Sequence, residues 1–116
     1  MNIYLDDLRD CPEGFTIART MDDAIKLLEE NDVEILSLDH DLGESKDGEL
    51  LPDGYDFVKY FCVNGLSVGK IYMHTDNGVG RANMYETLLA AQRRGFISKE
   101  IEIYHYSITP NRYSGD

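Results

Sequence analysis

The chain has 116 residues, a length that predicts one domain with one hydrophobic core. Its 22 acidic residues outnumber the 11 basic ones and give a net charge of −11, which argues against non-specific binding to duplex nucleic acid. No apolar run approaches membrane-spanning length, and the first expected strand leaves no room for a signal peptide, so we expect a cytoplasmic protein without membrane contact.

The first part of the chain predicts two strands and a helix. A short apolar strand, Ile3–Leu5, enters a polar loop over Asp6–Gly14, and a second strand follows over Phe15–Arg19. Thr20 has the character of an N-cap, with Asp23 three residues on in a capping-box-like arrangement. The helix that follows is predicted by apolar residues at helical spacing, namely Ala24, Ile25, Leu27 and Leu28.

The rest of the chain predicts strands that alternate with helices. The expected strands are Glu34–Asp39, Lys70–Thr75 and Glu100–Tyr104. The expected helices are Gly54–Val63, with Asp53 as its N-cap, and Asn77–Arg94, ended by Gly95. The expected irregular segments are a polar loop over Gly43–Pro52 and a polar tail over 107–116.

Helices between most of the strands favour an α/β fold, a three-layer sandwich on a five-stranded parallel sheet. The connection from Leu5 to Phe15 is shorter than the usual parallel crossover, which leaves a hairpin open. A hairpin would put Asp39 on the opposite edge of the sheet from Asp6. Nine extended residues reach about 30 Å, enough to run back along a short strand. We therefore predict a parallel second strand, reached by a loop in place of the first crossover helix, in a domain over residues 1–106.

Acidic residues follow two of the predicted strands directly. Asp6 and Asp7 come after the first strand, and Asp39 and Asp41 end or follow the third. If these strands are parallel neighbours, the four carboxylates meet at one edge of the sheet, where like charges demand a cation. An all-oxygen site suits Mg²⁺ or Mn²⁺ rather than zinc. The alternative is that these acids merely cap helices, but two such pairs favour a metal site.

The sequence resembles the receiver domains of response regulators. Those domains have an acidic pair after strand one, a phosphoacceptor aspartate after strand three and a Thr or Ser after strand four, which Asp6-Asp7, Asp39 and Thr75 match. The segment Asp53–Phe57 resembles the receiver sequence that enters the third helix. Strand five, however, ends without the expected Lys, since Lys99 stands at its other end. This departure puts ordinary phosphorelay signalling in doubt.

The sequence is more similar to a narrower family, the cyclic-phosphate processing receiver domains of bacteria and their phages. The similarity covers residues 3 to 96 and rests on several spaced motifs. The matching motifs are Leu5-Asp6-Asp7-Leu8-Arg9, Pro12-Glu13-Gly14, Arg19-Thr20, Ser37–Gly43 and His74–Arg81. The resemblance implies a receiver-like (flavodoxin-like) fold and chemistry on cyclic or terminal phosphates.

In receiver strand order, strands one and three are adjacent, and a ligand would bind beyond their carboxyl ends. The predicted metal ligands there are Asp6, Asp7, Asp39 and Asp41, the last by its carboxylate through a water molecule or, by analogy with receivers, by its backbone carbonyl. The start of the third helix predicts a phosphate cradle, because glycines, helix N–H groups and a planar guanidinium favour an anion. The predicted cradle residues are Thr75, Asn77, Gly78, Gly80 and Arg81. Arg9 would bind phosphate or neutralise Asp6, Asp7 or Asp10.

These residues predict metal-dependent phosphoester chemistry, and the resemblance implies that the substrate is a cyclic or terminal phosphate of a nucleotide or RNA end. Asp39 would hold the metal or act as nucleophile, and His74 and His40 are candidate acid–base groups. His105 and Tyr104 could line the pocket against a base or sugar, or simply pack. The alternative is a non-catalytic receiver-like module that sequesters a nucleotide signal or is phosphorylated on Asp39. The expected partner is a small phosphate ligand or RNA end, and the protein is a monomer or homodimer.

Overall fold

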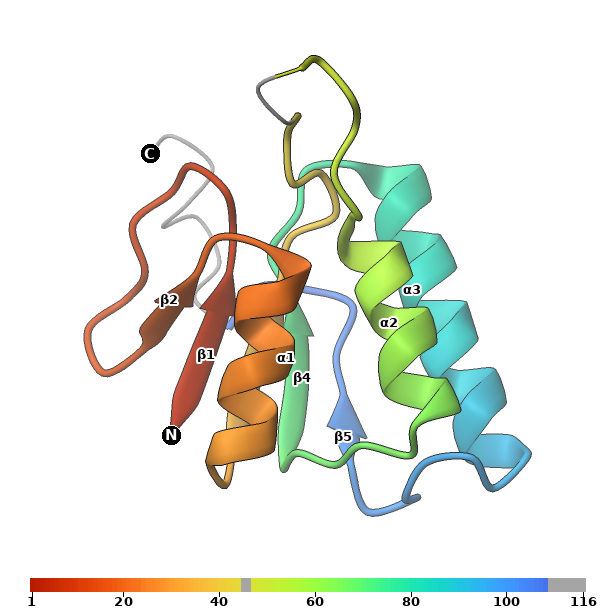
Figure 1. Ribbon diagram of the computed structural model, residues 1–116. Helices are drawn as coiled ribbons and strands as arrows, with labels where there is room; N and C mark the ends of the chain where they lie inside the picture. Colours follow the sequence, from red (N-terminus) through yellow and green to blue (C-terminus); the bar gives the residue numbers. More distant parts are fainter. Residues whose placement is uncertain (45–46, 109–116) are drawn as a thin grey trace.

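The computed structural model describes residues 1–44 and 47–108, so the predicted tail over 107–116 lies outside the description except for its first two residues. These described residues form a five-stranded sheet in the order β2-β1-β3-β4-β5 with three helices (Figure 1). The strands are β1 Asn2–Leu5, β2 Thr16–Ala18, β3 Ile35–Leu38, β4 Lys70–Met73 and β5 Glu102–Ile103. The helices are α1 Met21–Glu30, α2 Gly54–Val63 and α3 Gly78–Arg93.

All neighbouring strands are parallel, including β1 and β2, where Ile3 pairs with Thr16. The predicted parallel second strand and the loop in place of the first crossover helix are therefore confirmed. Inside that loop, the N–H of Phe15 donates to the carbonyl of Pro12 at 3.1 Å. The guanidinium of Arg19 donates to the carbonyl of Arg9 at 2.8 Å and to that of Asp6 at 3.3 Å. These bonds fix the loop without a helix.

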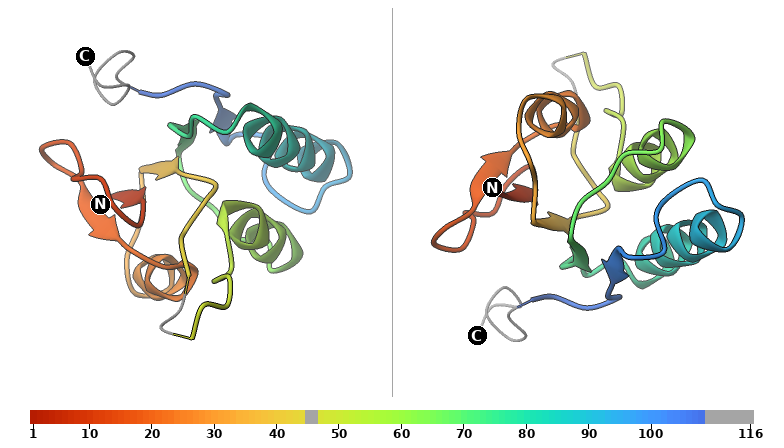
Figure 2. Two further views of the ribbon diagram at one scale, coloured as in Figure 1. Left: turned by 90° about the horizontal axis from the view of Figure 1, so that it is seen from above. Right: turned by 90° about the horizontal axis from the view of Figure 1, so that it is seen from below.

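The three helices lie on the same face of the sheet, as both views of Figure 2 show. The predicted receiver-like sheet is confirmed, but the described residues add one helical layer to it and not the two that a three-layer sandwich implies. The handedness of crossovers explains the difference. The connections from β2 to β3, β3 to β4 and β4 to β5 all move in one direction across the sheet, so the right-handed rule places their helices together. Only the β1–β2 connection moves the other way, and it is the loop.

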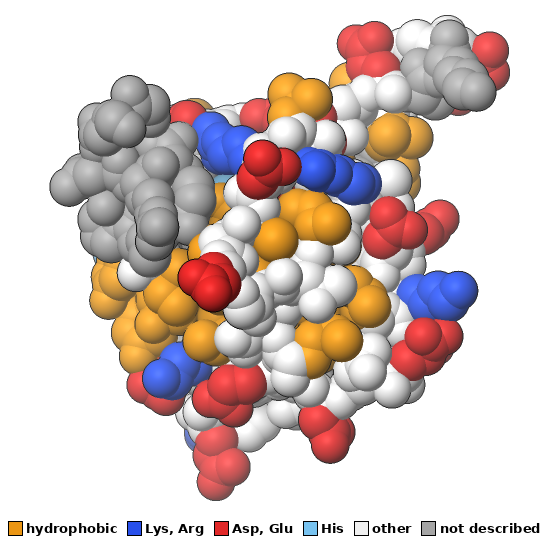
Figure 3. All heavy atoms as spheres, turned by 90° about the vertical axis from the view of Figure 1, so that its left-hand side faces the viewer, with side chains coloured by type: hydrophobic (Ala, Val, Ile, Leu, Met, Phe, Trp, Pro, Cys, Tyr) orange, Lys and Arg blue, Asp and Glu red, His pale blue; other side chains and the backbone are white. Residues whose placement is uncertain are grey.

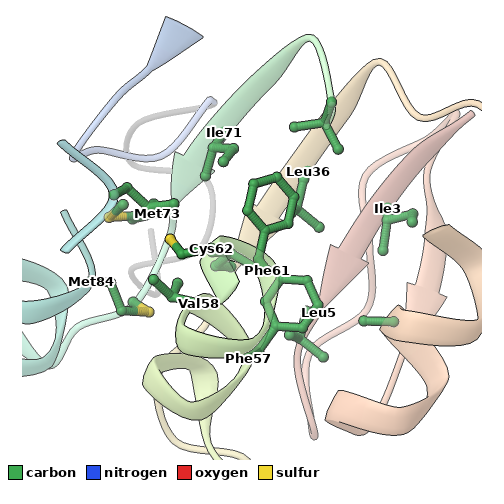
Figure 4. Packing of buried hydrophobic residues seen from close by; sticks show 14 of the residues in the cluster. Ile3, Leu5, Leu36, Phe57, Val58, Phe61, Cys62, Ile71, Met73 and Met84 are labelled. Atoms are coloured by element: carbon green, nitrogen blue, oxygen red, sulfur yellow. The ribbon is translucent and has the colours of Figure 1, made fainter. Parts of the chain in front are cut away.

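The hydrophobic core fills the space between this face and the helices. Side chains of β1, β3 and β4 point at α2, whose inner face carries Phe57, Val58 and Phe61 (Figure 4). These three residues are at most 1% exposed, and burial of such side chains stabilises the fold by about 1.5–3 kcal/mol each. None of the helices in the described part of the chain is long and apolar enough to cross a membrane.

The predicted helix ends are confirmed closely. Asp53 and Asp56 form a reciprocal capping box at the start of α2, with each side chain accepting from the other's backbone N–H. Gly95 follows the C-cap of α3 with a φ of +80°, the left-handed conformation that glycine adopts without strain. Strand β1 begins one residue before the predicted Ile3–Leu5. The other four strands are shorter than predicted, above all β5, which is an edge strand of two residues instead of Glu100–Tyr104.

Candidate functional site

Three strand ends deliver the central residues of the candidate site. Leu5, Leu38 and Met73 are in register across β1, β3 and β4. The residues after them are Asp6, Asp39 and His74, and the sheet bonding continues through all three. The N–H of Asp6 donates to the carbonyl of Ala18 at 3.0 Å, that of Asp39 to the carbonyl of Leu5 at 2.9 Å, and that of His74 to the carbonyl of Leu38 at 3.0 Å. The site therefore lies beyond the carboxyl edge, where strand order reverses at β1.

His74 is buried among polar partners, and its side chain is 0% exposed. Its Nε2 atom contacts Asp6 Oδ2 at 3.0 Å, and its Nδ1 atom contacts Ser37 Oγ at 2.7 Å. An ionised carboxylate only accepts, so Nε2 donates to Asp6, and in the neutral ring Nδ1 accepts from the Ser37 hydroxyl. The ring also stacks on Tyr4, with centroids 3.9 Å apart and planes 7° apart. These contacts fix both the orientation and the tautomer of His74.

Asp6 is held ionised by its surroundings. Burial of its side chain opposes the charge and by itself would raise the pKa. The hydrogen bond from His74 and the backbone N–H groups of Arg9 and Leu8 outweigh burial and lower the pKa of Asp6 to about 2. Those N–H groups lie 2.8 and 2.9 Å from Oδ1. Because both oxygens accept from the protein, Asp6 is a fixed negative charge in the site.

Asp39 has the opposite electrostatic character. Burial and the negative charge of Asp6 raise its pKa, although the N–H of His40 and the hydroxyl of Thr75 both donate to its carboxylate. The residue is 9% exposed. Asp39 is thus an incompletely compensated acid beside a second acid, the arrangement that a bound cation would stabilise.

Asp6, Asp39 and His74 could hold a metal ion, because each offers a ligand atom and these atoms lie within 4.8 Å of one another. Two of the four predicted acidic ligands therefore come together, joined by a histidine that was expected to act as an acid or base. Asp7 is outside this group, and its Oδ2 atom lies beside Gly43, in the loop between β3 and α2. Asp41 is also outside it, with a side chain that is 70% exposed.

The first turn of α3 has the geometry of an anion site. Asn77 is the N-cap and accepts from the N–H of Gly80 at 2.9 Å, while its own N–H donates to the Thr75 hydroxyl at 3.1 Å. No residue of the described ranges accepts from the N–H groups of Gly78 and Val79, both of which are exposed. Two of the unpaired donors at this helix end are therefore available to an anion.

Arg81 lies one turn further along the same helix. Its Nη1 atom donates to the carbonyl of Thr75 at 3.3 Å, which brings the guanidinium beside the exposed first turn. The predicted cradle residues Thr75, Asn77, Gly78 and Arg81 are thus brought together. Gly80 lies in the same turn, but its N–H is used by the cap and the residue itself is buried.

Gly80 and Gly54 are required by the position of His40. A Cβ atom on Gly80 would overlap the His40 ring, and a Cβ atom on Gly54 would overlap the backbone of Asp39. The His40 Nδ1 atom contacts Asp41 Oδ1 at 3.0 Å, and its Nε2 atom lies 3.7 Å from Asp53 Oδ2. His40 therefore packs between α2 and α3, at the exposed side of the site, rather than within the buried group.

Arg9 forms ion pairs with acids at two strand ends. Its Nη1 atom lies 3.5 Å from Asp6 Oδ2, and its Nη2 atom donates to Asp76 Oδ2 at 2.7 Å. Nη1 also donates to the carbonyl of His74 at 3.3 Å. Neutralisation of Asp6, one of the alternatives predicted for Arg9, is present, and Asp76 is a further partner that was not predicted. Phosphate binding by Arg9 stays a prediction. Arg9 joins the β1 and β4 ends over the buried group.

Sequence reasoning missed two residues that shape the site, Ser37 and Tyr4. Both lie within strands and alternate with the core residues Leu36 and Leu5, so they face away from the helices. A polar Ser in an otherwise apolar strand was the available signal for the first. The stacking of Tyr4 on a histidine more than sixty positions away had no local signal.

Residues 1–90 match the model of a protein family described as "Cyclic-phosphate processing Receiver domain". The match covers β1 to the greater part of α3, and so includes every residue of the site described above. No curated protein and no solved structure matched the chain.

Proposed function

The chain belongs to the cyclic-phosphate processing receiver domain family, and from this premise we propose that it carries out metal-dependent phosphoester chemistry. The substrate is a cyclic or terminal phosphate of a nucleotide or of an RNA end. The observation that carries the proposal is the environment of Asp39. This buried acid has a raised pKa, and the hydroxyl of Thr75 joins it to the N-cap of α3. Thr75 therefore links the proposed cation site at Asp39 to the proposed anion site at the start of α3.

The metal in this proposal is Mg²⁺ or Mn²⁺, held by Asp39 and Asp6. Carboxylate oxygens suit both ions. When bound, the cation would neutralise phosphate charge and lower the pKa of a bound water. The raised pKa of Asp39 supports this assignment, because a cation would offset the repulsion between Asp39 and Asp6.

The phosphate in this proposal binds at the first turn of α3. The N–H groups of Gly78 and Val79 donate to its oxygens, and Arg81 adds a planar pair of donors. The ligand is a small phosphate compound or an RNA end and not a duplex, because a net charge of −11 repels an extended phosphate backbone. On the face drawn in Figure 3, basic side chains lie singly beside acidic ones and form no continuous basic patch among the described residues.

Hydrolysis of a cyclic phosphate forms a bond between a water oxygen and phosphorus and breaks one P–O bond of the ring. A proton moves from the water to the leaving oxygen. Of the two candidate histidines, His40 is better placed to carry it, because its ring lies against the first turn of α3 and contacts the exposed Asp41. His74 has both ring nitrogens engaged in a buried site, and we assign it to positioning Asp6.

The test is turnover of nucleoside 2′,3′-cyclic monophosphates and of an oligoribonucleotide ending in a 2′,3′-cyclic phosphate. Reactions contain Mg²⁺, Mn²⁺ or EDTA, and ring opening is followed by ³¹P NMR. We expect cation-dependent release of a monoester and a loss of at least about 100-fold in the variant Asp39→Asn. The matched control is Asp22→Asn, an exposed acid in the first turn of α1. Equal turnover in EDTA, or in Asp39→Asn, would contradict the proposal.

A stability measurement tests the metal assignment without reference to activity. In EDTA at neutral pH, Asp39→Asn is expected to melt at a higher temperature than the parent protein, because the substitution removes a buried charge next to Asp6. With saturating Mn²⁺ the order should reverse, since only the parent gains stability from a cation bound through this carboxylate. A variant that is less stable than the parent in EDTA would argue that Asp39 needs no cation.

Binding without turnover is the second candidate function, and the burial of His74 favours it. With both ring nitrogens of that histidine engaged, the site could retain a nucleotide signal without the proton transfers that cleavage needs. The same ³¹P experiment separates the two functions. A cyclic ligand that binds, broadens its resonance and remains unopened would identify a module that sequesters the signal.

A further inference from the structure

A cavity of about 290 Å³ lies next to the proposed phosphate site, between α3 and the segment that follows β5. Its lining residues are Gly78, Arg81, Ala82, Tyr85, Glu86 and His105. The volume is at the lower end of the range of about 300–1,000 Å³ that is typical of small-molecule sites. It suits one planar ring system rather than a whole nucleotide.

Five of the lining residues form one stripe along α3. Positions 78, 81, 82, 85 and 86 are spaced by three and four, so they share one face of the helix. From Gly78 to Tyr85 the axis advances about 10 Å, and the tyrosine side chain leans back toward the N-terminal turn. The cavity therefore begins where the phosphate is proposed to bind and continues toward an aromatic wall.

The second aromatic residue of the cavity is His105, which adjoins Tyr85 and which backbone bonds to β4 hold in place. The N–H of Tyr104 donates to the carbonyl of Ile71 at 2.8 Å, and the carbonyl of Tyr106 accepts from the N–H of Met73 at 3.1 Å. The His105 ring lies 5.1 Å from the Tyr85 ring, with the planes 72° apart. Tyr85 is half-buried and His105 is exposed, so a ligand can reach the ring faces.

We propose that this cavity is a nucleobase subsite, and that the phosphate ligand is therefore a nucleotide, with guanine the favoured base. The assignment of the adjoining phosphate rests on the function proposed above. A base stacks on an aromatic ring whatever its identity, whereas a phosphate alone makes no use of an aromatic surface. Glu86 would select among the bases, because a carboxylate only accepts hydrogen bonds and so favours a base that presents donors. Guanine presents two neighbouring donors, N1–H and N2–H, while adenine presents an acceptor at N1.

The test uses nucleosides, which carry no phosphate, in the presence of EDTA. Guanosine is titrated into the protein, and the ring resonances of Tyr85 and His105 are followed by NMR. We expect saturable shifts of both rings and weaker shifts with adenosine. Tyr85→Leu keeps the packing against the core but removes the stacking ring, and should weaken guanosine binding about 5-fold or more. Glu86→Gln should abolish the preference for guanosine over adenosine.

The matched control is Tyr60→Leu, which removes a half-buried tyrosine of α2 that does not line the cavity and should leave guanosine binding unchanged. Because neither phosphate nor metal is present, the result is independent of phosphoester turnover. If turnover fails and guanosine still binds, only the proposed chemistry is lost. If guanosine shifts neither ring, or binds Tyr85→Leu as well as the parent, the base subsite is overturned. Adenosine binding as tightly as guanosine would overturn the choice of guanine.

Discussion

The site has a buried half and an exposed half that are built differently. The buried half consists of Asp6, Ser37 and His74, where the Asp6 and His74 side chains are 1% and 0% exposed and their contacts are 2.7 to 3.0 Å long. The exposed half consists of His40, Asp41, Asn77 and Arg81. There the Asp41 side chain is 70% exposed, and Asn77 Nδ2 lies 3.3 Å from Asp41 and 3.4 Å from His40.

This difference indicates a division of labour. A polar group removed from water must be paired or it destabilises the fold, so the contacts of the buried half are expected to be tight and difficult to exchange. The solvent-exposed contacts of the other half, including the 3.0 Å contact between His40 and Asp41, are worth little individually and can be replaced by contacts to a ligand. We therefore expect the buried half to determine stability and electrostatics, and the exposed half to determine ligand binding.

The sharpest test of this comparison is the same substitution in both halves. His74→Ala leaves Asp6 buried without its main hydrogen-bond donor and should lower the free energy of unfolding by about 3–5 kcal/mol. His40→Ala removes ion pairs to exposed acids and the packing of a ring that is 15% exposed, and should cost about 2 kcal/mol or less. Urea unfolding at neutral pH measures both values. Equal losses in the two variants would show that the halves do not differ in the way proposed.

The pH dependence of stability probes the charge of Asp6. Its pKa of about 2 in the folded protein lies below the ordinary value of 3.8. The ionised carboxylate therefore contributes to the free energy of unfolding above pH about 4, and this contribution is lost as the pH falls toward 2. A shift of this size corresponds to about 2 kcal/mol. Urea midpoints measured in EDTA across this range should fall steeply for the parent and less steeply for Asp6→Asn. Asp22→Asn, exposed on α1, should retain the parent's slope.

Much of the site could be predicted from sequence because its residues follow strands directly. Asp6, Asp39 and His74 each come after an apolar run, and parallel neighbours bring such positions to one edge. The position of His40 and the identity of its partners could not be predicted in this way. They depend on the packing of α2 against α3, which brings Asp53 and Gly80 to the same imidazole from distant parts of the chain.

The placement of all three helices on one face of the sheet follows from the strand order, but helices were predicted on both faces. Once β2 is placed as a parallel strand on the far side of β1, every later crossover moves in one direction and its helix falls on one face. The helix-free face is instead closed at the site by aromatic and polar side chains. Tyr4 is 0% exposed there, between the His74 ring and an edge contact with Phe15. Local periodicity carries no information about such contacts.

Within the buried half, Ser37 should stabilise the His74 ring without setting its tautomer, because ionised Asp6 requires the proton on Nε2. Ser37→Ala removes the hydroxyl that faces Nδ1 and should lower the free energy of unfolding by about 1–2 kcal/mol, since a buried acceptor loses its partner. The direct readout is the ¹⁵N chemical shift of the two ring nitrogens in EDTA. We expect the parent's single tautomer, with the proton on Nε2, in both Ser37→Ala and Ser37→Thr. A mixture of tautomers in Ser37→Ala would mean that Asp6 alone does not hold the ring in one tautomer.

The exposed half can be tested with two glycines of the first turn of α3, for which the expected effects differ in sign. An added Cβ on Gly80 would meet the His40 ring, and this overpacking costs about 1–3 kcal/mol. The gain in helix propensity offsets up to about 1 kcal/mol, so Gly80→Ala should lower stability by about 1 kcal/mol. Gly78→Ala meets only the far end of Arg81, at 4.0 Å, and should be neutral or slightly stabilising. Thermal unfolding of the two variants measures the difference. If Gly80→Ala is as stable as Gly78→Ala, the added methyl group displaces the His40 ring from this turn without a loss of stability. A bound ligand could then displace the ring in the same way.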